Sequence, residues 1–166
     1  MELHLHWPHR MQHQVDWPAA AVSGFAAGAV LMVLELAWAA AGGRSPWATS
    51  YNIAAIVMGR ELLQSPVFSI GIVILALAIH YALGIVFGLL LGSLLSNYLP
   101  GWGPVEVTSV GAVFGLALYA LDFYLLAPLF PWIAELRGGP AFMAHLVFGM
   151  SAALLYWKLQ RRGAKR

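Results

Sequence analysis

Four long apolar segments dominate the sequence, and they constrain the fold more than any other feature. They cover residues 18–41, 68–95, 104–126 and 141–159. A helix needs about 20 apolar residues to cross a bilayer, so each segment is long enough for one span. Only 10% of the residues are charged, against about 25% in a typical soluble domain. The sequence therefore predicts an all-α polytopic membrane protein, folded as a bundle of four transmembrane helices.

Lys and Arg are distributed unevenly over the two sides that four spans define. Arg10, Lys158, Arg161, Arg162, Lys165 and Arg166 would lie on the side of both termini, and Arg44, Arg60 and Arg137 on the other side. Cytoplasmic loops of membrane proteins carry an excess of Lys and Arg. The bias therefore predicts that both termini are cytoplasmic.

One pattern of glycine and acid occurs twice in the chain. The pattern pairs Gly24 with Gly111, Gly28 with Gly115, and Glu35 with Asp122. A Pro-Trp dipeptide follows each acid, and a His-x-x-x-Gly motif follows each dipeptide, as “HYALG” and “HLVFG”. Two copies with the same number of spans and the same polarity are parallel repeats, an arrangement known in transporters. We predict a bundle built from two parallel two-helix repeats.

These assignments divide the chain into four parts. A polar cytoplasmic leader covers 1–17, the first repeat covers 18–97, the second repeat covers 98–160, and a basic cytoplasmic tail covers 161–166. After the first span, residues 50–64 predict a short amphipathic helix at the membrane interface. The leader is rich in histidine, which by itself is compositional evidence only, and we interpret it as a flexible polar segment.

Glycines and polar residues share the same helix faces, because residues four or seven positions apart lie on one side of a helix. Small residues let helices approach closely in a membrane. The predicted packing positions are Gly24, Gly28, Gly84, Gly88, Gly92, Gly111, Gly115 and Gly149. Two carboxylates and two imidazoles lie on these faces and are predicted to form one cluster in the half of the bundle away from the termini: Glu35, His80, Asp122 and His145.

The predicted cluster admits several functions. Ionisable residues inside a membrane often mark functional sites, and this donor set suits Zn, Mn, Fe or Cu. Our leading hypothesis is that the cluster binds a transition-metal ion or conducts protons, without catalytic chemistry. In one alternative the acids and histidines are structural pairs in a non-catalytic accessory subunit of a larger complex, such as a respiratory one. In the other, His80 and His145 ligate one haem b in an electron-transfer subunit.

Other functional classes lack support in the sequence. The chain contains no cysteine, so it has no thiolate metal site or disulfide. It has no glycine-rich phosphate loop followed by Lys and no Ser-His-Asp arrangement, so no catalytic residue is predicted. No basic stripe indicates nucleic acid. The predicted partners are the lipid bilayer and either further copies of the chain or a larger membrane complex, because four spans make a small bundle.

Three segments carry a family resemblance. The stretches “GFAAGAVLMVLELAWAAAGGRSPW”, “IAAIVMG” and “AHLVFG” resemble small bacterial inner-membrane proteins, including the YagU-like group and others labelled as sodium:proline symporters. A true sodium-solute symporter needs many more than four spans. The resemblance implies a four-span protein of the bacterial inner membrane, and it implies no catalytic residue.

Overall fold

The computed structural model describes residues 14–64, 67–98 and 101–163, and this part of the chain folds into helices without a strand. The helices are α1 (Trp17–Ala41), α2 (Ala48–Met58), η1 (Arg60–Gln64), α3 (Ile70–Tyr98), α4 (Pro104–Ala120), η2 (Leu121–Leu126), η3 (Pro131–Leu136) and α5 (Gly139–Gly163). The short elements η1 and η3 are 3-10 helices, and η2 is a π-helix that continues α4. Most of the predicted leader and the last residues of the predicted tail lie outside the described residues.

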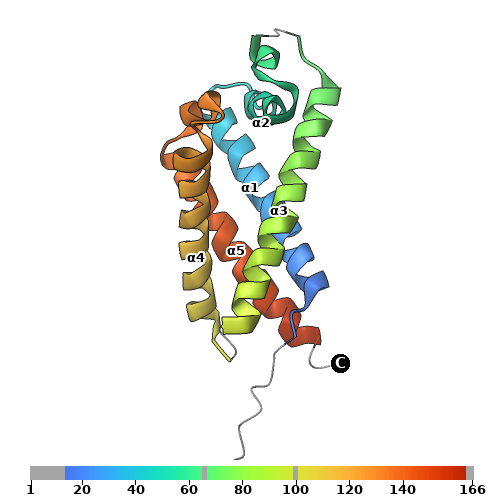
Figure 1. The fold of residues 1–166 in the computed structure, drawn as a ribbon, viewed down its shortest axis with the longest axis vertical. Helices are drawn as coiled ribbons and strands as arrows, with labels where there is room; N and C mark the ends of the chain where they lie inside the picture. Colours follow the sequence, from blue (N-terminus) through green and yellow to red (C-terminus); the bar gives the residue numbers. More distant parts are fainter. Residues whose placement is uncertain (1–13, 65–66, 99–100, 164–166) are drawn as a thin grey trace, which may run out of the picture.

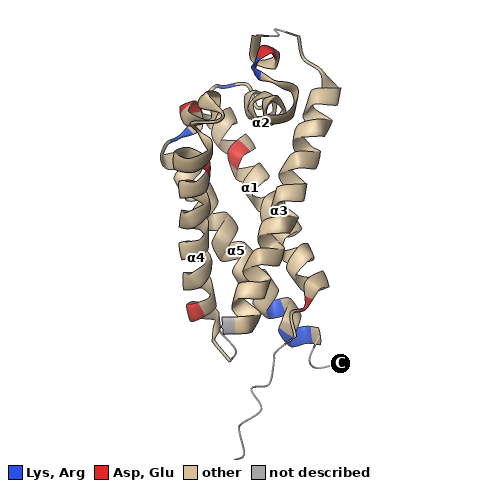
Figure 2. Cartoon of the chain, viewed as in Figure 1, with Lys and Arg blue, Asp and Glu red and all other residues tan. Residues whose placement is uncertain are grey.

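Within the residues that the structure describes, four helical segments are long and apolar enough to cross a membrane: Trp17–Ala41, Ile70–Asn97, Pro104–Leu126 and Gly139–Gly163. Each overlaps one predicted span, so the predicted all-α four-span bundle is confirmed (Figure 1). The chain alternates in direction, which gives the bundle two ends. We call them the α2 end, where α1 ends and α3 begins, and the terminal end, where α1 begins and α5 ends. Most charged residues gather at these two ends (Figure 2).

Local sequence signals explain where α1 begins and ends. The Asp16 side chain accepts a hydrogen bond from the backbone N–H of Ala19 at 3.0 Å, which satisfies one of the free donors of the first turn. Pro18 lies in that turn, where its missing N–H is of no consequence. After Ala41 the chain turns at Gly43, whose φ of +64° is readily adopted by glycine.

Helices α1 and α3 cross in backbone contact. A Cβ atom added to Gly24 would overlap the carbonyl oxygen of Gly84 and lie 2.8 Å from the Cα atom of Gly88. Helices α4 and α5 make the same kind of contact, because a Cβ atom on Gly111 would overlap the carbonyl oxygen of Gly149. Only glycine permits so close an approach. The two helix pairs then join where α1 packs along α5.

The α1–α3 crossing leaves a wedge toward the α2 end, because the two helices diverge beyond it (Figure 1). Helix α2 packs against α3 in this region, with Ala54 and Ala55 buried. The Tyr51 hydroxyl donates a hydrogen bond to the Val67 carbonyl at 2.9 Å and accepts one from the Ser69 N–H at 2.8 Å. These bonds attach α2 to the start of α3.

The helix predicted at 50–64 is two shorter helices in the structure. Helix α2 ends at Met58, and η1 begins at Arg60. Gly59 lies between them with a φ of +95°, a conformation that residues with a side chain rarely adopt. The side chain of Trp132 in η3 donates a hydrogen bond to the Asn52 carbonyl at 3.1 Å, so α2 is held from the α4–α5 side as well.

At the terminal end, Tyr156 joins three of the helices. Its side chain is 1% exposed, and its hydroxyl is hydrogen-bonded to the Ser96 hydroxyl of α3. The same hydroxyl accepts a hydrogen bond from the backbone N–H of Asp16, just before α1, at 3.3 Å. These hydrogen bonds link α1, α3 and α5 at the terminal end.

Candidate functional site

The predicted four-residue metal cluster is wrong. In the part of the chain that the structure describes, no group of three or more His, Asp or Glu side chains lies close enough together to hold a metal ion. Of the four predicted residues, only Asp122 and His145 contact each other, and Glu35 and His80 have other surroundings. The hypothesis that the cluster binds a metal or conducts protons therefore loses its basis.

Asp122 and His145 form a pair between η2 and α5. Oδ2 of Asp122 lies 3.0 Å from Nε2 of His145, and Nδ1 of His145 lies 2.7 Å from the carbonyl oxygen of Ala141. Asp122 is the second residue of the π-helix, and its own carbonyl accepts a hydrogen bond from the N–H of Ala127 at 3.0 Å. This wider turn sets the position of Asp122 opposite His145.

The hydrogen bonds of His145 determine the charge of the pair. A carbonyl oxygen can only accept, so Nδ1 carries a proton and donates it to Ala141. The hydrogen-bond distance of 3.0 Å between Nε2 and the carboxyl oxygen needs one more proton between the two groups. On whichever atom that proton resides, the charges of Asp122 and His145 sum to zero. A neutral, internally hydrogen-bonded pair is the form that costs least inside a membrane.

His80 is engaged differently. Its Nε2 donates a hydrogen bond to the Gly28 carbonyl of α1 at 2.9 Å, and its ring packs edge-on against Tyr81. The haem hypothesis required His80 and His145 to face each other across a macrocycle. Instead, both ring nitrogens of His145 and Nε2 of His80 are taken by hydrogen bonds within the bundle, so this hypothesis is withdrawn as well.

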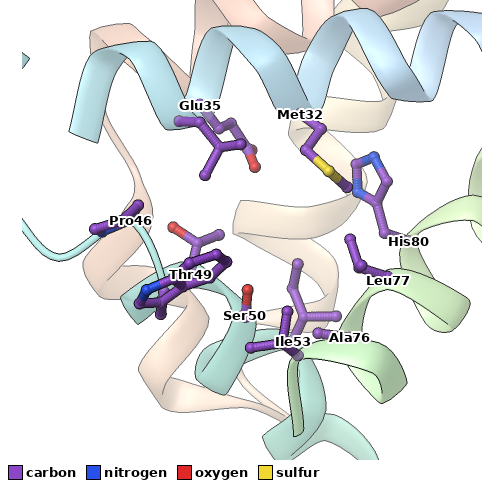
Figure 3. Close-up of a pocket in the computed structure, with 12 residues that line it drawn as sticks. Met32, Glu35, Pro46, Thr49, Ser50, Ile53, Ala76, Leu77 and His80 are labelled. Carbon is purple, nitrogen blue, oxygen red and sulfur yellow. The ribbon is translucent and has the colours of Figure 1, made fainter. Parts of the chain in front are cut away.

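A cavity of about 130 Å³ occupies the wedge at the α2 end. Twelve residues line it, contributed by α1, by the loop that precedes α2, by α2 and by α3 (Figure 3). We call this cavity the wedge pocket. Most of its wall is apolar, and its polar side chains are those of Glu35, Thr49, Ser50 and His80. The pocket exists because the glycine crossing brings α1 and α3 together at one level and lets them separate above it.

The Glu35 carboxyl group points from α1 into the wedge pocket (Figure 3). Within the described residues it has neither a hydrogen-bond partner nor an ion-pair partner. No buried side-chain oxygen or nitrogen of this part of the chain lacks a partner, so the Glu35 oxygens are accessible from the cavity. In this view the Met32 side chain lies between Glu35 and His80.

The sequence pattern singled out Glu35 and His80 but did not find the other polar residues of the pocket. Thr49 and Ser50 follow the Pro-Trp dipeptide at the start of α2. Neither has a charge or a motif that distinguishes it from an ordinary surface residue. Only the packing of α2 against α3 brings their hydroxyl groups to the same cavity as Glu35.

No protein-family model, no curated protein and no solved structure matches this chain. The resemblance to the YagU-like group therefore stays a prediction.

Proposed function

We propose that the protein is an integral membrane protein that binds a small organic molecule in the wedge pocket. One observation carries the proposal: Glu35 presents a carboxyl group without a partner among the described residues to a cavity inside the bundle. An ionisable group at membrane depth is costly unless something pairs with it. A bound molecule that fills the cavity and contacts Glu35 supplies that partner.

The size of the wedge pocket limits the ligand. Apolar cavities of about 150 Å³ can hold a benzene molecule. A cavity of about 130 Å³ is therefore matched to a group of roughly five or six non-hydrogen atoms. Such a ligand is either a small molecule or one end of a larger one that extends out of the pocket.

The second acid of the bundle supports a special role for Glu35. Asp122, which the predicted duplication pairs with Glu35, lies opposite His145 and forms a closed polar pair. The matching glycine contacts, Gly24 with Gly84 and Gly111 with Gly149, support that duplication. Asp122 therefore has a histidine as its partner. Glu35, in the matching position, faces the wedge pocket instead.

We also propose that the protein lies in the bacterial inner membrane with both termini in the cytoplasm. The terminal end carries Lys158 and the basic last turn of α5, with Arg161 and Arg162, and the positive-inside rule places that end in the cytoplasm. The wedge pocket then lies in the half of the membrane that faces away from the cytoplasm. Association into a homo-oligomer or a larger membrane complex stays a prediction.

Titration with n-butanol tests ligand binding in the wedge pocket. The indole N–H signal of Trp47, which lines the pocket, should shift in ¹⁵N NMR spectra of the detergent-solubilised protein and saturate. The indole of Trp157, hydrogen-bonded to the Trp102 carbonyl at 2.9 Å, should stay in place and serves as the control for detergent effects. Ser50→Leu, which fills part of the cavity, should abolish the Trp47 shift. A shift that is equal at both indoles, or that survives in Ser50→Leu, would refute the proposal.

A further inference from the structure

We infer that the ligand of the wedge pocket carries a primary ammonium group, which Glu35 binds. This inference rests on the proposed function and adds the chemical class of the ligand. The first observation that supports the inference is the charge of the pocket. Among the twelve described residues that line the pocket, Glu35 is the only Asp, Glu, Lys or Arg, so this lining offers no Lys or Arg to pair with it or to receive an anion. A carboxylate ligand would find no Lys or Arg among these residues to balance its charge in a largely apolar cavity, which is strongly unfavourable.

The hydrogen-bonding groups of the pocket are the second support. An ammonium group has three N–H donors and no acceptor, and the lining offers acceptor oxygens on Glu35, Thr49 and Ser50. His80 adds a further acceptor, because its Nε2 donates to the Gly28 carbonyl and the Nδ1 of the neutral ring is then unprotonated. Donors on the ligand thus have matching acceptors on α1, α2 and α3.

The aromatic wall is the third support. Trp47 lines the pocket, and its ring packs against Phe68 with the ring centroids 5.6 Å apart. Trp is the side chain with the strongest attraction for a cation over its ring face. The pocket thus combines one carboxylate, three further acceptors and one indole with apolar walls, a set that suits a short alkyl chain ending in an ammonium group.

Two sources of this chemistry exist, the ethanolamine headgroup of a lipid and a free alkylamine. Glu35 lies six residues before Ala41, or on the order of 9 Å below the end of α1. That depth is within reach of a headgroup from the adjacent lipid layer and of a small amine from the water phase. A primary ammonium group is common to both sources. A change in the lipid composition of the membrane distinguishes them.

The charge preference of the pocket is measured with three probes of equal length: n-butylammonium, n-butanol and n-butyrate. Each is titrated at pH 7 while the Trp47 and Trp157 indole signals are recorded in phosphatidylcholine nanodiscs. We expect n-butylammonium to bind at least about tenfold more tightly than n-butanol, as for a charge-assisted hydrogen bond, and n-butyrate not to bind. Glu35→Gln, which keeps the size of the side chain, should remove the preference, so that n-butylammonium binds no more tightly than n-butanol.

The control variant is Glu61→Gln, since Glu61 is an exposed carboxylate on η1 outside the pocket. It should retain the full preference for n-butylammonium. Equal affinities for n-butylammonium and n-butanol, or an unchanged preference in Glu35→Gln, would overturn the inference and leave the proposed function standing. Failure of all three probes would overturn both.

Nanodiscs that also contain phosphatidylethanolamine identify the source of the amine. If that lipid shifts the Trp47 signal without added probe and weakens n-butylammonium binding, the headgroup occupies the pocket. If n-butylammonium binds equally in both lipid mixtures, the ligand is a free amine. Both results support recognition of a primary ammonium group through Glu35.

Discussion

Replacing Gly24 by alanine should weaken the bundle at the contact that creates the wedge pocket. The three heavy atoms nearest to a Cβ atom at this position belong to the backbone of Gly84 and Gly88. None of them can rotate away as the end of a side chain can. The Cβ atom would lie 2.8 Å from the Cα atom of Gly88, whereas two carbon atoms pack best at about 3.5–4.0 Å. Helices α1 and α3 would therefore have to separate by about 1 Å.

The expected loss of stability in Gly24→Ala follows from this clash. Forcing an extra methyl group into a close-packed contact costs about 1–3 kcal/mol, and a backbone contact that cannot relax belongs at the upper end. The higher helix propensity of alanine returns up to about 1 kcal/mol. The net loss for Gly24→Ala should be about 2 kcal/mol, roughly a 30-fold change in the unfolding equilibrium.

Gly28→Ala is the matched control, one turn along the same helix. A Cβ atom at Gly28 would meet only side-chain atoms, the nearest being Nε2 of His80 at 3.5 Å, which is an ordinary contact. This variant should unfold at the same denaturant level as the parent protein or at a higher one, because it gains helix propensity without a clash. Equilibrium unfolding in mixed micelles of SDS and a mild detergent, followed by circular dichroism, measures both. If Gly24→Ala proves as stable as Gly28→Ala, the backbone crossing is not the contact that holds α1 on α3.

Two further predictions test the polar pair and the membrane orientation. Asp122→Ala removes the acceptor that faces Nε2 of His145 and should lower the stability by about 1–3 kcal/mol, while Asp122→Asn keeps an acceptor oxygen and should cost less. Thermal unfolding in detergent compares them, and equal losses would argue against a structural hydrogen bond. The chain has no cysteine, so single cysteines report topology without background. Ser45→Cys should react with a membrane-impermeant maleimide in intact bacteria and Gly163→Cys only after lysis; the reverse pattern would invert the proposed orientation.

The transmembrane helices could be predicted from the sequence because each depends on a local property. A run of about 20 apolar residues is helical in a bilayer, where every backbone N–H and C=O must be bonded within the segment. The span predicted at 104–126 coincides with the observed Pro104–Leu126. Pro104 also marks its start locally, since proline is favoured in a first helical turn. The spacing of Gly24 and Gly28, by contrast, could not show that one meets backbone and the other only side chains.

The candidate site could be predicted only in part. The sequence singled out Glu35, His80, Asp122 and His145 from their place on glycine-bearing helix faces, and the pairing of Asp122 with His145 follows from adjacent, antiparallel helices. The sequence did not indicate that Glu35 would face a cavity, nor that Thr49 and Ser50 would share it. Those contacts join α1 to α2 and α3, and their geometry depends on how far α1 and α3 diverge beyond Gly24.

Glu35 and Asp122 lie in similar sequence contexts but have different surroundings in the structure. The sequence alone therefore does not determine what each acid contacts. Composition and periodicity determined that the chain forms four apolar helices and that Glu35 and Asp122 lie on their glycine faces. Tertiary structure alone decided that Asp122, on a π-helical turn, meets His145, while Glu35, on an unbroken α-helix, faces the wedge pocket. The physical reason is that a side chain's partner depends on the distance and angle between two helices, and spacing along one helix does not contain that information.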